Sequence, residues 1–238
     1  MRKDGRRNDE LRPVKITTGF VKFAEGSVLI ECGDTKVLCN ASVEERVPPH
    51  VRPGHGWVTA EYSMLPRANR ERSRRDIDKL KLSSRSAEIQ RLIGRSLRAA
   101  VDLEALGERT ITIDCDVLQG DGGTRTASVT GGFIALALAC RKLVEEGYIG
   151  RNPIRHFVSG VSAGIVDDTA VLDLPYSEDS RAQVDLNCIM NELGEIIEIQ
   201  GTGEGRAFTV REQQELLELC AKGNRELIAK QREILGRL

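Results

Sequence analysis

Alternation of apolar and polar positions predicts a β-hairpin near the start of the chain. Residues 27–31 and 36–43 alternate with a period of two, and residues 32–34 between them have a typical turn composition. Residues 57–62 show the same strand pattern. From residue 84 to about 103 the apolar side chains recur at helical spacing instead, so the pattern predicts a helix there.

The rest of the chain repeats this theme. A helix that is apolar on most sides should run from about residue 126 to 146, and a last one from residue 209 to about 234, where Thr209 and Glu212 form a capping box. Further strands are predicted at 111–118, 158–166, 171–174, 182–190 and 196–200, with a turn at 167–169. Strands and helices thus recur in two sets without a linker, which predicts one α/β (α+β) domain over residues 1–238 with internal pseudo-symmetry.

Composition is that of a soluble globular protein, with 40% hydrophobic and 30% charged residues. The 35 basic and 36 acidic side chains leave a net charge of only -1, so a polyanion would have to bind to local patches. No apolar leader follows the basic N-terminus, and the stretch 131–140 is too short to span a bilayer, so we expect a cytoplasmic protein without membrane association. The six cysteines are predicted to be free, buried thiols.

Two positions along the chain are suited to binding phosphate. Gly123, Thr124 and Arg125 stand between a predicted strand and a predicted helix, where backbone N–H groups, a hydroxyl and a guanidinium can surround an anion. Arg85 follows a serine that should cap the start of another helix. An ordinary glycine turn with a solvated arginine is the alternative interpretation.

Two acidic residues, Asp179 and Asp185, provide possible catalytic groups. They could instead be a turn acid and a polar residue at a strand edge. If the chain turns just after Asp179, the carboxylates converge, and a cation such as Mg²⁺ would neutralise their repulsion. Without metal, one acid would be protonated and could act as a general acid. Together with the cationic positions, these acids suggest phosphoryl or nucleotidyl transfer.

Residues 67–75 contain five arginines and one glutamate, and Ala68 is their only apolar residue. We expect an exposed, mobile loop, extending to about residue 82, that cannot pack against the core. It is either a solvated charged segment or a contact for the repeating phosphates of single-stranded RNA.

Long motifs follow one another along nearly the whole chain: Gly-Asp-Thr-Lys-Val-Leu-Cys at 33–39, Gly-Trp-Val-Thr-Ala-Glu-Tyr-Ser-Met-Leu-Pro-Arg at 56–67, Asp-Cys-Asp-Val-Leu-Gln-Gly-Asp-Gly-Gly-Thr-Arg-Thr-Ala-Ser at 114–128, Glu-Asp-Ser at 178–180 and Glu-Ile-Gln-Gly-Thr at 198–202. In this order they resemble the bacterial ribonuclease PH family. The set is far more specific than any single motif in it. Ser83 and Ser84 depart from the glycines of many relatives, so this loop is expected to be stiffer.

The resemblance implies a ribosomal protein S5 domain 2-like fold and a phosphate-dependent 3′-to-5′ exoribonuclease, formally a tRNA nucleotidyltransferase. Such an enzyme trims the 3′ ends of tRNA precursors, releases nucleoside diphosphates and assembles as a homohexamer, a trimer of dimers. The implied site residues are Arg85, Gly123, Thr124 and Arg125 for inorganic phosphate, Asp179 and Asp185 for catalysis and Mg²⁺, and Arg67, Arg70, Arg72, Arg74 and Arg75 for RNA.

Two other functions compete with this interpretation. One is a non-catalytic ring subunit that only guides RNA, although the joint presence of the phosphate-site arginines and both acids argues against it. The other is a small-molecule kinase of a similar fold. The chain contains no P-loop signature and no glycine-rich dinucleotide motif after a strand, so an ATP-binding loop is not evident.

Overall fold

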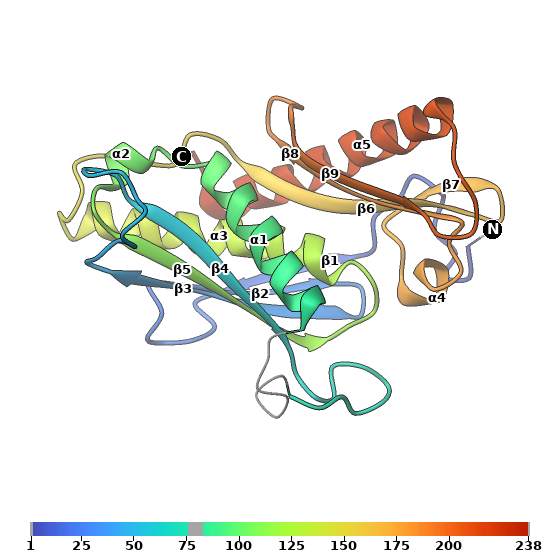
Figure 1. Cartoon of the computed structure of the whole chain (residues 1–238), viewed down its shortest axis with the longest axis horizontal. Coiled ribbons are helices and arrows are strands. Elements are labelled where there is room, and N and C mark those ends of the chain that lie inside the picture. The colour runs from blue at the N-terminus through green and yellow to red at the C-terminus, as the bar shows by residue number, and fades with distance from the viewer. Residues whose placement is uncertain (1, 76–82, 238) are drawn as a thin grey trace.

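The computed structural model describes residues 2–75 and 83–237, in which two β-sheets enclose a layer of helices (Figure 1). The first sheet has the strand order β1-β2-β3-β5-β4, and β4 and β5 are parallel. Its strands are β1 (Val14–Thr18), β2 (Gly26–Cys32), β3 (Thr35–Glu44), β4 (Trp57–Met64) and β5 (Thr110–Gln119). The second sheet, in the order β7-β6-β8-β9, contains β6 (Val158–Val166), β7 (Thr169–Leu172), β8 (Val184–Asn191) and β9 (Ile196–Gly203).

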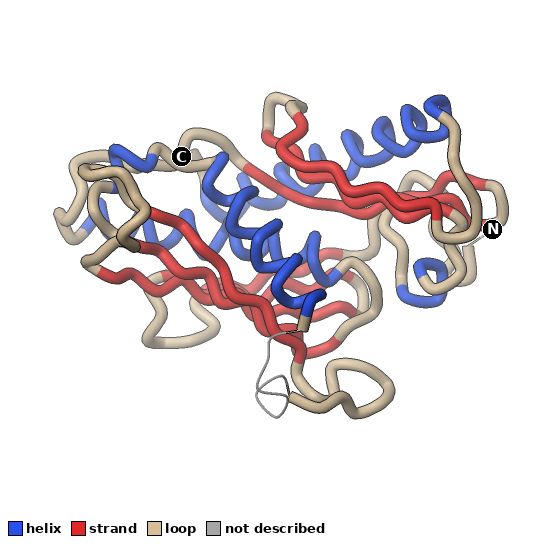
Figure 2. The backbone as a smooth tube through the Cα atoms, in the orientation of Figure 1, coloured by secondary structure: helices blue, strands red, loops and turns tan. Residues whose placement is uncertain are grey.

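Helix α3 (Thr124–Glu145) is the centre of the helical layer. A Cβ added to Gly131 would lie 2.7 Å from Ile30 of the first sheet, and one added to Gly160 of the second sheet would lie 3.4 Å from Thr126. The helix is long and apolar enough to cross a membrane, but 78% of its most apolar window is buried inside the structure. Figure 2 shows this layer between the two sets of strands; the other helices are α1 (Ser84–Ala99), α2 (Leu103–Leu106), α4 (Tyr176–Asp179) and α5 (Val210–Leu235).

Both predicted hairpins are confirmed. Cys32 pairs with Thr35 across the turn that joins β2 to β3, and Val166 pairs with Thr169 across the turn that joins β6 to β7. The capping box at the start of α5 is also present, because the Thr209 side chain accepts from the Glu212 N–H and the Glu212 carboxylate accepts from the Thr209 N–H. The six cysteines are buried and free, as predicted.

Several boundaries differ from the prediction. The predicted helix to residue 103 is wrong at its end: α1 stops at Ala99, and the Asp102 side chain then caps the separate helix α2 by accepting from the Ala105 N–H. Strand β1 and the single-turn helix α4 were not predicted. Strand β1 is a half-exposed edge strand and α4 has only four residues, so neither has a strong hydrophobic period.

The arginine-rich segment 67–75 also packs more than expected. Its five arginines are exposed, but Ala68 is buried, and the Ala68 carbonyl accepts from the Gly120 N–H at 2.8 Å. The expectation that the segment cannot pack is therefore wrong at its base, because one small apolar side chain suffices to anchor a turn. Residues 76–82 of the predicted loop lie outside the described residues.

Close packing of β2 on α3 yields a first test. A Cβ added to Gly26 would lie 1.9 Å from the carbonyl oxygen of Ala135, and the surrounding backbone cannot move without separating strand from helix. We expect Gly26→Ala to lower the free energy of unfolding by about 3 kcal/mol, measured by urea denaturation. Gly150→Ala is the matched control, because nothing lies within 4 Å of the added carbon. Equal stabilities for the two variants would contradict the packing described here.

Candidate active site

The N-terminus of α3 opens into a cleft of about 620 Å³. Gly122 and Gly123 precede the helix with φ angles of 76° and 65°, a left-handed conformation that glycine adopts without strain. The residue at the cap position is Gly123, which has no side chain to satisfy the first N–H groups of the helix. These N–H groups and the positive end of the helix dipole therefore favour an anion at this position.

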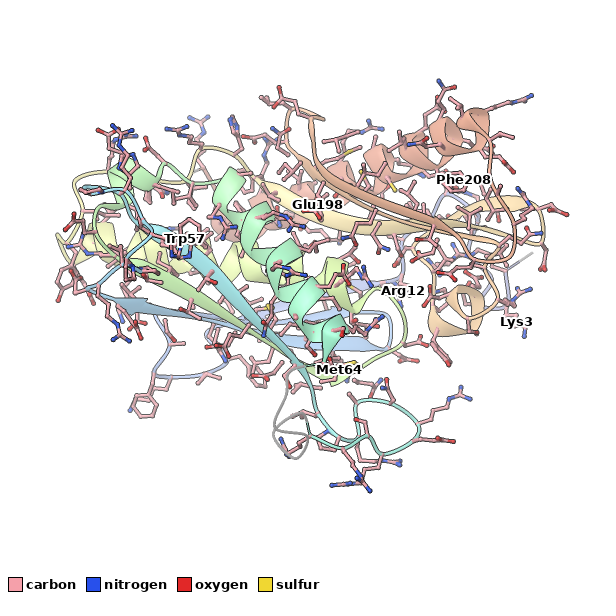
Figure 3. All side chains as sticks on the ribbon, in the orientation of Figure 1. Lys3, Arg12, Trp57, Met64, Glu198 and Phe208 are labelled. Atoms are coloured by element: carbon pink, nitrogen blue, oxygen red, sulfur yellow. The ribbon has the colours of Figure 1, made fainter. Side chains whose placement is uncertain are left out.

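The cleft brings together four of the six predicted phosphate-binding and catalytic residues, and Arg125 and Asp185 are not among the residues that line it. Arg85, Gly123, Thr124 and Asp179 all line it, although they come from three separate segments of the chain. Arg70 from the arginine-rich segment lines it as well. Figure 3 shows Met64, another lining residue, at the end of β4 where the chain enters this segment. The phosphate-binding and RNA-binding predictions thus fall on adjoining parts of one surface.

Thr124, the first residue of α3, is held by a buried tyrosine. The hydroxyls of Tyr62 and Thr124 are 2.9 Å apart, and either can donate. When Tyr62 donates, the Thr124 hydroxyl hydrogen is directed to another acceptor, such as a phosphate oxygen. Burial raises the pKa of Tyr62, so this residue stays a neutral donor.

Arg125 is oriented by α1 and by the second sheet. Its Nη1 atom donates to Oε1 of Glu88 at 3.2 Å and to Oε1 of Gln200 at 2.7 Å. Gln200 in turn donates to Glu88 at 3.0 Å, so the three side chains form a closed set of contacts. Among the described residues these contacts use only Nη1 of the Arg125 guanidinium, which leaves its other N–H donors for an anion.

Arg85 lies in the first turn of α1, as the serine cap predicted. The Ser83 hydroxyl accepts from the Ser86 N–H at 3.0 Å and so caps the helix. Arg85, Thr124 and Asp179 line the same cleft. Burial raises the pKa of Asp179, and the charges of Arg85 and Arg125 partly oppose this rise. The two predicted phosphate-binding positions therefore belong to one site.

Asp179 and Asp185 converge because the chain turns between them. Asp179 ends α4, and its carbonyl accepts from the Ala182 N–H at 3.1 Å before β8 begins. Burial is the largest cause of a raised pKa for both carboxyls, and the charge of Asp179 helps to raise the pKa of Asp185 to about 6. The turn that convergence requires is thus present.

The same pair fits a magnesium ion that is shared with substrate. Mg²⁺ commonly takes one or two protein carboxylates and completes its shell with water and phosphate oxygens. Within residues 2–75 and 83–237 no group of three or more acidic, histidine or cysteine ligands could enclose a metal alone. Two half-buried acids, of which Asp185 has a pKa raised by burial and by the charge of Asp179, are a donor set that a cation would stabilise.

Anion-binding helix ends opposite paired carboxylates suit an enzyme that transfers phosphoryl or nucleotidyl groups. Comparison with known families gives a more specific assignment. Models described as "3′ exoribonuclease family, domain 1" and "domain 2" match residues 10–142 and 156–223. The chain belongs to the 3′ exoribonuclease family.

Curated relatives narrow the enzyme class. Ribonuclease PH of Syntrophomonas wolfei is 57% identical over 236 residues, covering 99% of each chain. Ribonuclease PH of Bacillus subtilis is 58% identical over 238 residues, covering 99% of this chain and 97% of the relative. These relatives confirm the predicted activity, a phosphorolytic 3′-to-5′ exoribonuclease of the nucleotidyltransferase class.

Solved structures confirm the predicted fold class, α/β with the ribosomal protein S5 domain 2-like arrangement. Rrp46 of rice superimposes with a TM-score of 0.80 at 18% identity, covering 98% of this chain and 100% of that one. A chain of the Archaeoglobus fulgidus exosome, with RNA bound to the active site, superimposes with a TM-score of 0.81 at 25% identity. The match covers 96% of this chain and 92% of that one.

Tyr62, Glu88 and Gln200 were missed as site residues by sequence reasoning. Tyr62 continues the buried alternation of β4, so it was assigned to a strand only. A tyrosine at a buried strand position needs a hydrogen-bond partner for its hydroxyl, and this requirement was the available signal. No local pattern reveals that Glu88 and Gln200, which are 112 residues apart, meet at one arginine.

The raised pKa of Asp185 yields a stability test. The pKa of Asp185 is about 6 in the folded protein and 3.8 in the unfolded chain. Between these two pH values the folded protein binds a proton that the unfolded chain does not, so the free energy of unfolding falls as pH rises through this window. In EDTA, we expect Asp185→Asn to be more stable than the parent at pH 8 by about 1–3 kcal/mol. The gain should vanish below the ordinary aspartate pKa, as followed by urea denaturation. A gain that is the same at every pH would exclude this cause.

Proposed function

We propose that the protein trims the 3′ ends of tRNA precursors, with inorganic phosphate as the attacking co-substrate. The observation that carries this proposal is one cleft that contains the N-terminus of α3, Arg85 and Asp179. Phosphate would lie against the N–H groups after Gly123, within reach of Thr124 and of the free donors of Arg125. Arg85 supports it from the start of the neighbouring helix.

In the proposed reaction, an oxygen of inorganic phosphate attacks the phosphorus of the last phosphodiester of the RNA. A new phosphoanhydride bond forms while the bond from phosphorus to the 3′ oxygen breaks. The products are a nucleoside diphosphate and an RNA shortened by one nucleotide, whose 3′ oxygen takes up a proton. Because a phosphodiester is exchanged for a phosphoanhydride, the reaction runs in reverse when diphosphates are abundant.

Asp179 and Asp185 are proposed to hold Mg²⁺ beside the scissile phosphate. Bound there, the cation supplies positive charge that offsets the negative charge accumulating on phosphorus oxygens. The arginines act from the other side of the cleft and orient the attacking phosphate. Burial raises the pKa of both carboxyls, and the charge of Asp179 further raises that of Asp185 to about 6, so a cation between them would offset the cost of keeping both ionised.

The arginine-rich segment is proposed to hold the RNA chain as it approaches the cleft. Arg70 already lines the cleft, and the bond from Gly120 to the Ala68 carbonyl ties the base of the segment to the phosphate-binding turn. Long exposed arginines contact phosphates with little sequence preference. The proposed contacts are Arg67, Arg70, Arg72, Arg74 and Arg75, all exposed.

A homohexamer, built as a trimer of dimers, is part of the same proposal. Its support is the turn between β1 and β2, where Phe20 is 50% exposed and Phe23 is 85% exposed. Large aromatic side chains on a surface turn favour burial against another chain.

Product analysis tests the proposed reaction. Incubation with a tRNA precursor, Mg²⁺ and phosphate should release nucleoside diphosphates at a rate that saturates with phosphate. Asp179→Asn should lower the rate by at least about 100-fold while RNA binding is retained, since the carboxylate acts on the reacting phosphate. Glu146→Gln, at the opposite end of α3, is the matched control and should keep full activity. Monophosphate products, or turnover without phosphate, would contradict the proposal.

Salt dependence tests the RNA contact. Replacing Arg70, Arg72, Arg74 and Arg75 by alanine should weaken single-stranded RNA binding and lower the slope of log affinity against log salt by up to about 3. The KM for phosphate should change little, because Arg85 and Arg125 are untouched. Fluorescence anisotropy across salt concentrations measures the slope, and Arg211→Ala on α5 is the control. An unchanged slope would assign the segment to solvated surface.

A further inference from the structure

We propose that Arg12 and Asp173 form a clamp that positions the phosphate-binding loop, residues 120–123, relative to α4 and its Asp179. In this role both are positioning residues, which act through the loop and the helix and do not touch substrate. The inference rests on the proposed function of the cleft. It extends the site to the N-terminal segment, which the proposed reaction does not use.

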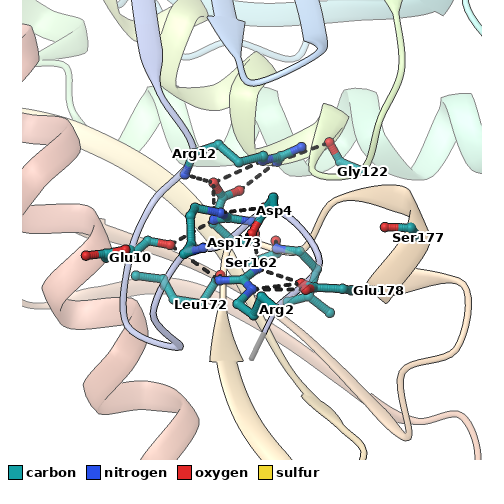
Figure 4. A network of polar contacts seen from close by, with 12 residues as sticks. Arg2, Asp4, Glu10, Arg12, Gly122, Ser162, Leu172, Asp173, Ser177 and Glu178 are labelled. Carbon is teal, nitrogen blue, oxygen red and sulfur yellow. Dashed lines mark hydrogen bonds and ion pairs between the residues drawn. The ribbon is translucent and has the colours of Figure 1, made fainter.

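Arg12 donates three hydrogen bonds to the Asp173 carboxylate (Figure 4). Its backbone N–H and its Nε both donate to Oδ2, at 2.7 and 3.0 Å, and its Nη2 donates to Oδ1 at 2.6 Å. The side chains are only 5% and 9% exposed. Asp173 also has a left-handed φ of 53°, a conformation that a non-glycine residue keeps only when its surroundings hold it.

The other edge of the same guanidinium holds the phosphate-binding loop. Nη1 donates to the Asp121 carbonyl at 2.5 Å, and Nη2 donates to the Gly122 carbonyl at 3.4 Å. Thr35 adds a second anchor, since its hydroxyl donates to the Gly122 carbonyl at 2.7 Å and accepts from the Asp121 N–H at 2.9 Å. Arg12 and Thr35 thus hold the Asp121 and Gly122 carbonyls in place. The next residues, Gly123 and Thr124, line the cleft.

The loop and the start of α4 are in direct contact as well. A Cβ added to Gly122 would lie 2.4 Å from the carbonyl oxygen of Leu174 and 2.9 Å from the carbonyl carbon of Pro175. Asp121 accepts from the Tyr176 N–H at 3.3 Å. A shift of the loop would therefore be transmitted to α4, and Arg12 fixes the relative position of the two.

A second arginine of the N-terminal segment fixes α4 next to its catalytic acid. Nη2 of Arg2 lies 2.6 Å from Oε2 of Glu178, and these side chains are 3% and 5% exposed. Arg2 also donates to the Leu172 carbonyl at 2.7 Å and to the Asp173 carbonyl at 2.9 Å. Glu178 directly precedes Asp179, so this pair limits the movement of the helix turn that carries the acid.

A general stabilising role does not explain this arrangement well. Buried ion pairs gain little net stability, because removing both ions from water costs about as much as their attraction returns. The planar guanidinium of Arg12 instead fixes an orientation. It bonds to Asp121 and to Asp173, which are 52 residues apart, and so holds these two segments at a defined angle to each other. Around metal sites, contacts that hold the functional groups in place change activity by about 10- to 100-fold when removed, and we expect an effect of this order here.

The test compares steady-state kinetics of Arg12→Lys and of the double variant Arg12→Gln with Asp173→Asn. The lysine variant keeps the charge but not the planar guanidinium. The double variant removes both charges of the pair, and Arg6, which lies 3.6 Å from Asp173, keeps Asp4 as its partner at 2.8 Å. We expect each to raise the KM for inorganic phosphate by about tenfold and to lower kcat by about tenfold, with the lysine variant less impaired. RNA binding measured without phosphate should stay within about twofold of the parent.

Partial unfolding would have a different signature. It lowers the concentration of active enzyme, and thus the apparent kcat, but leaves the KM for phosphate unchanged. Lys222→Gln is the matched control: Lys222 ties the same N-terminal segment to α5 through Asp9, at 2.5 Å, but does not touch the loop. It should lower the melting temperature without changing the KM. Circular dichroism identifies the folded variants, and the lysine variant alone suffices if the double variant does not fold.

A wild-type KM for phosphate in a folded Arg12 variant would overturn the clamp, whether or not kcat falls. This outcome is distinct from failure of the proposed function. If the parent protein showed no saturable dependence on phosphate, the proposed reaction itself would be wrong. If the parent depends on phosphate and the variants share its KM and kcat, only the positioning role is lost.

Discussion

Burial of α3 between the two sheets is the constraint from which the site follows. The helix packs on the first sheet at Gly131 and faces the second sheet at Thr126. Hydroxyls of Ser128 and Thr130 bond back to carbonyls one turn earlier, so these buried hydroxyls find partners within the helix. A helix held on both sides cannot slide along its axis without losing these contacts. Its N-terminus is therefore fixed where the two sheets meet.

The two halves of the fold contribute opposite charges at that point. Arg85, Arg125 and the arginine-rich segment come from the half that contains the first sheet, whereas Asp179 and Asp185 come from the half that contains the second. Neither half alone has both the anion-binding helix end and the acids. The net charge of only -1 is thus the sum of local regions of opposite charge.

The sequence predicted what depends on neighbouring residues. Hairpin turns, the serine cap before Arg85 and the glycines before Thr124 each follow from a short pattern, and their structure agrees with it. Long-range contacts were not predictable in this way. Arg12 is one of several basic residues in the N-terminal segment, and only the packed fold places it against Asp173, which is 161 residues away. Family resemblance supplied the convergence of the acids, and physical pattern alone did not.

Among the polar contacts that cross from the arginine-bearing half to the acid-bearing half, two are made by arginines of the site. Arg125 reaches Gln200 on β9, and Arg12 reaches Asp173 ahead of α4. Apolar packing holds the halves together, but the hydrophobic effect is non-directional and does not by itself fix the angle at which polar groups meet. Hydrogen bonds from a planar guanidinium have fixed directions. Placing them beside the cleft, where a displacement of about 1 Å is costly for catalysis, gives the fold its rigidity at the one place where the chemistry needs it.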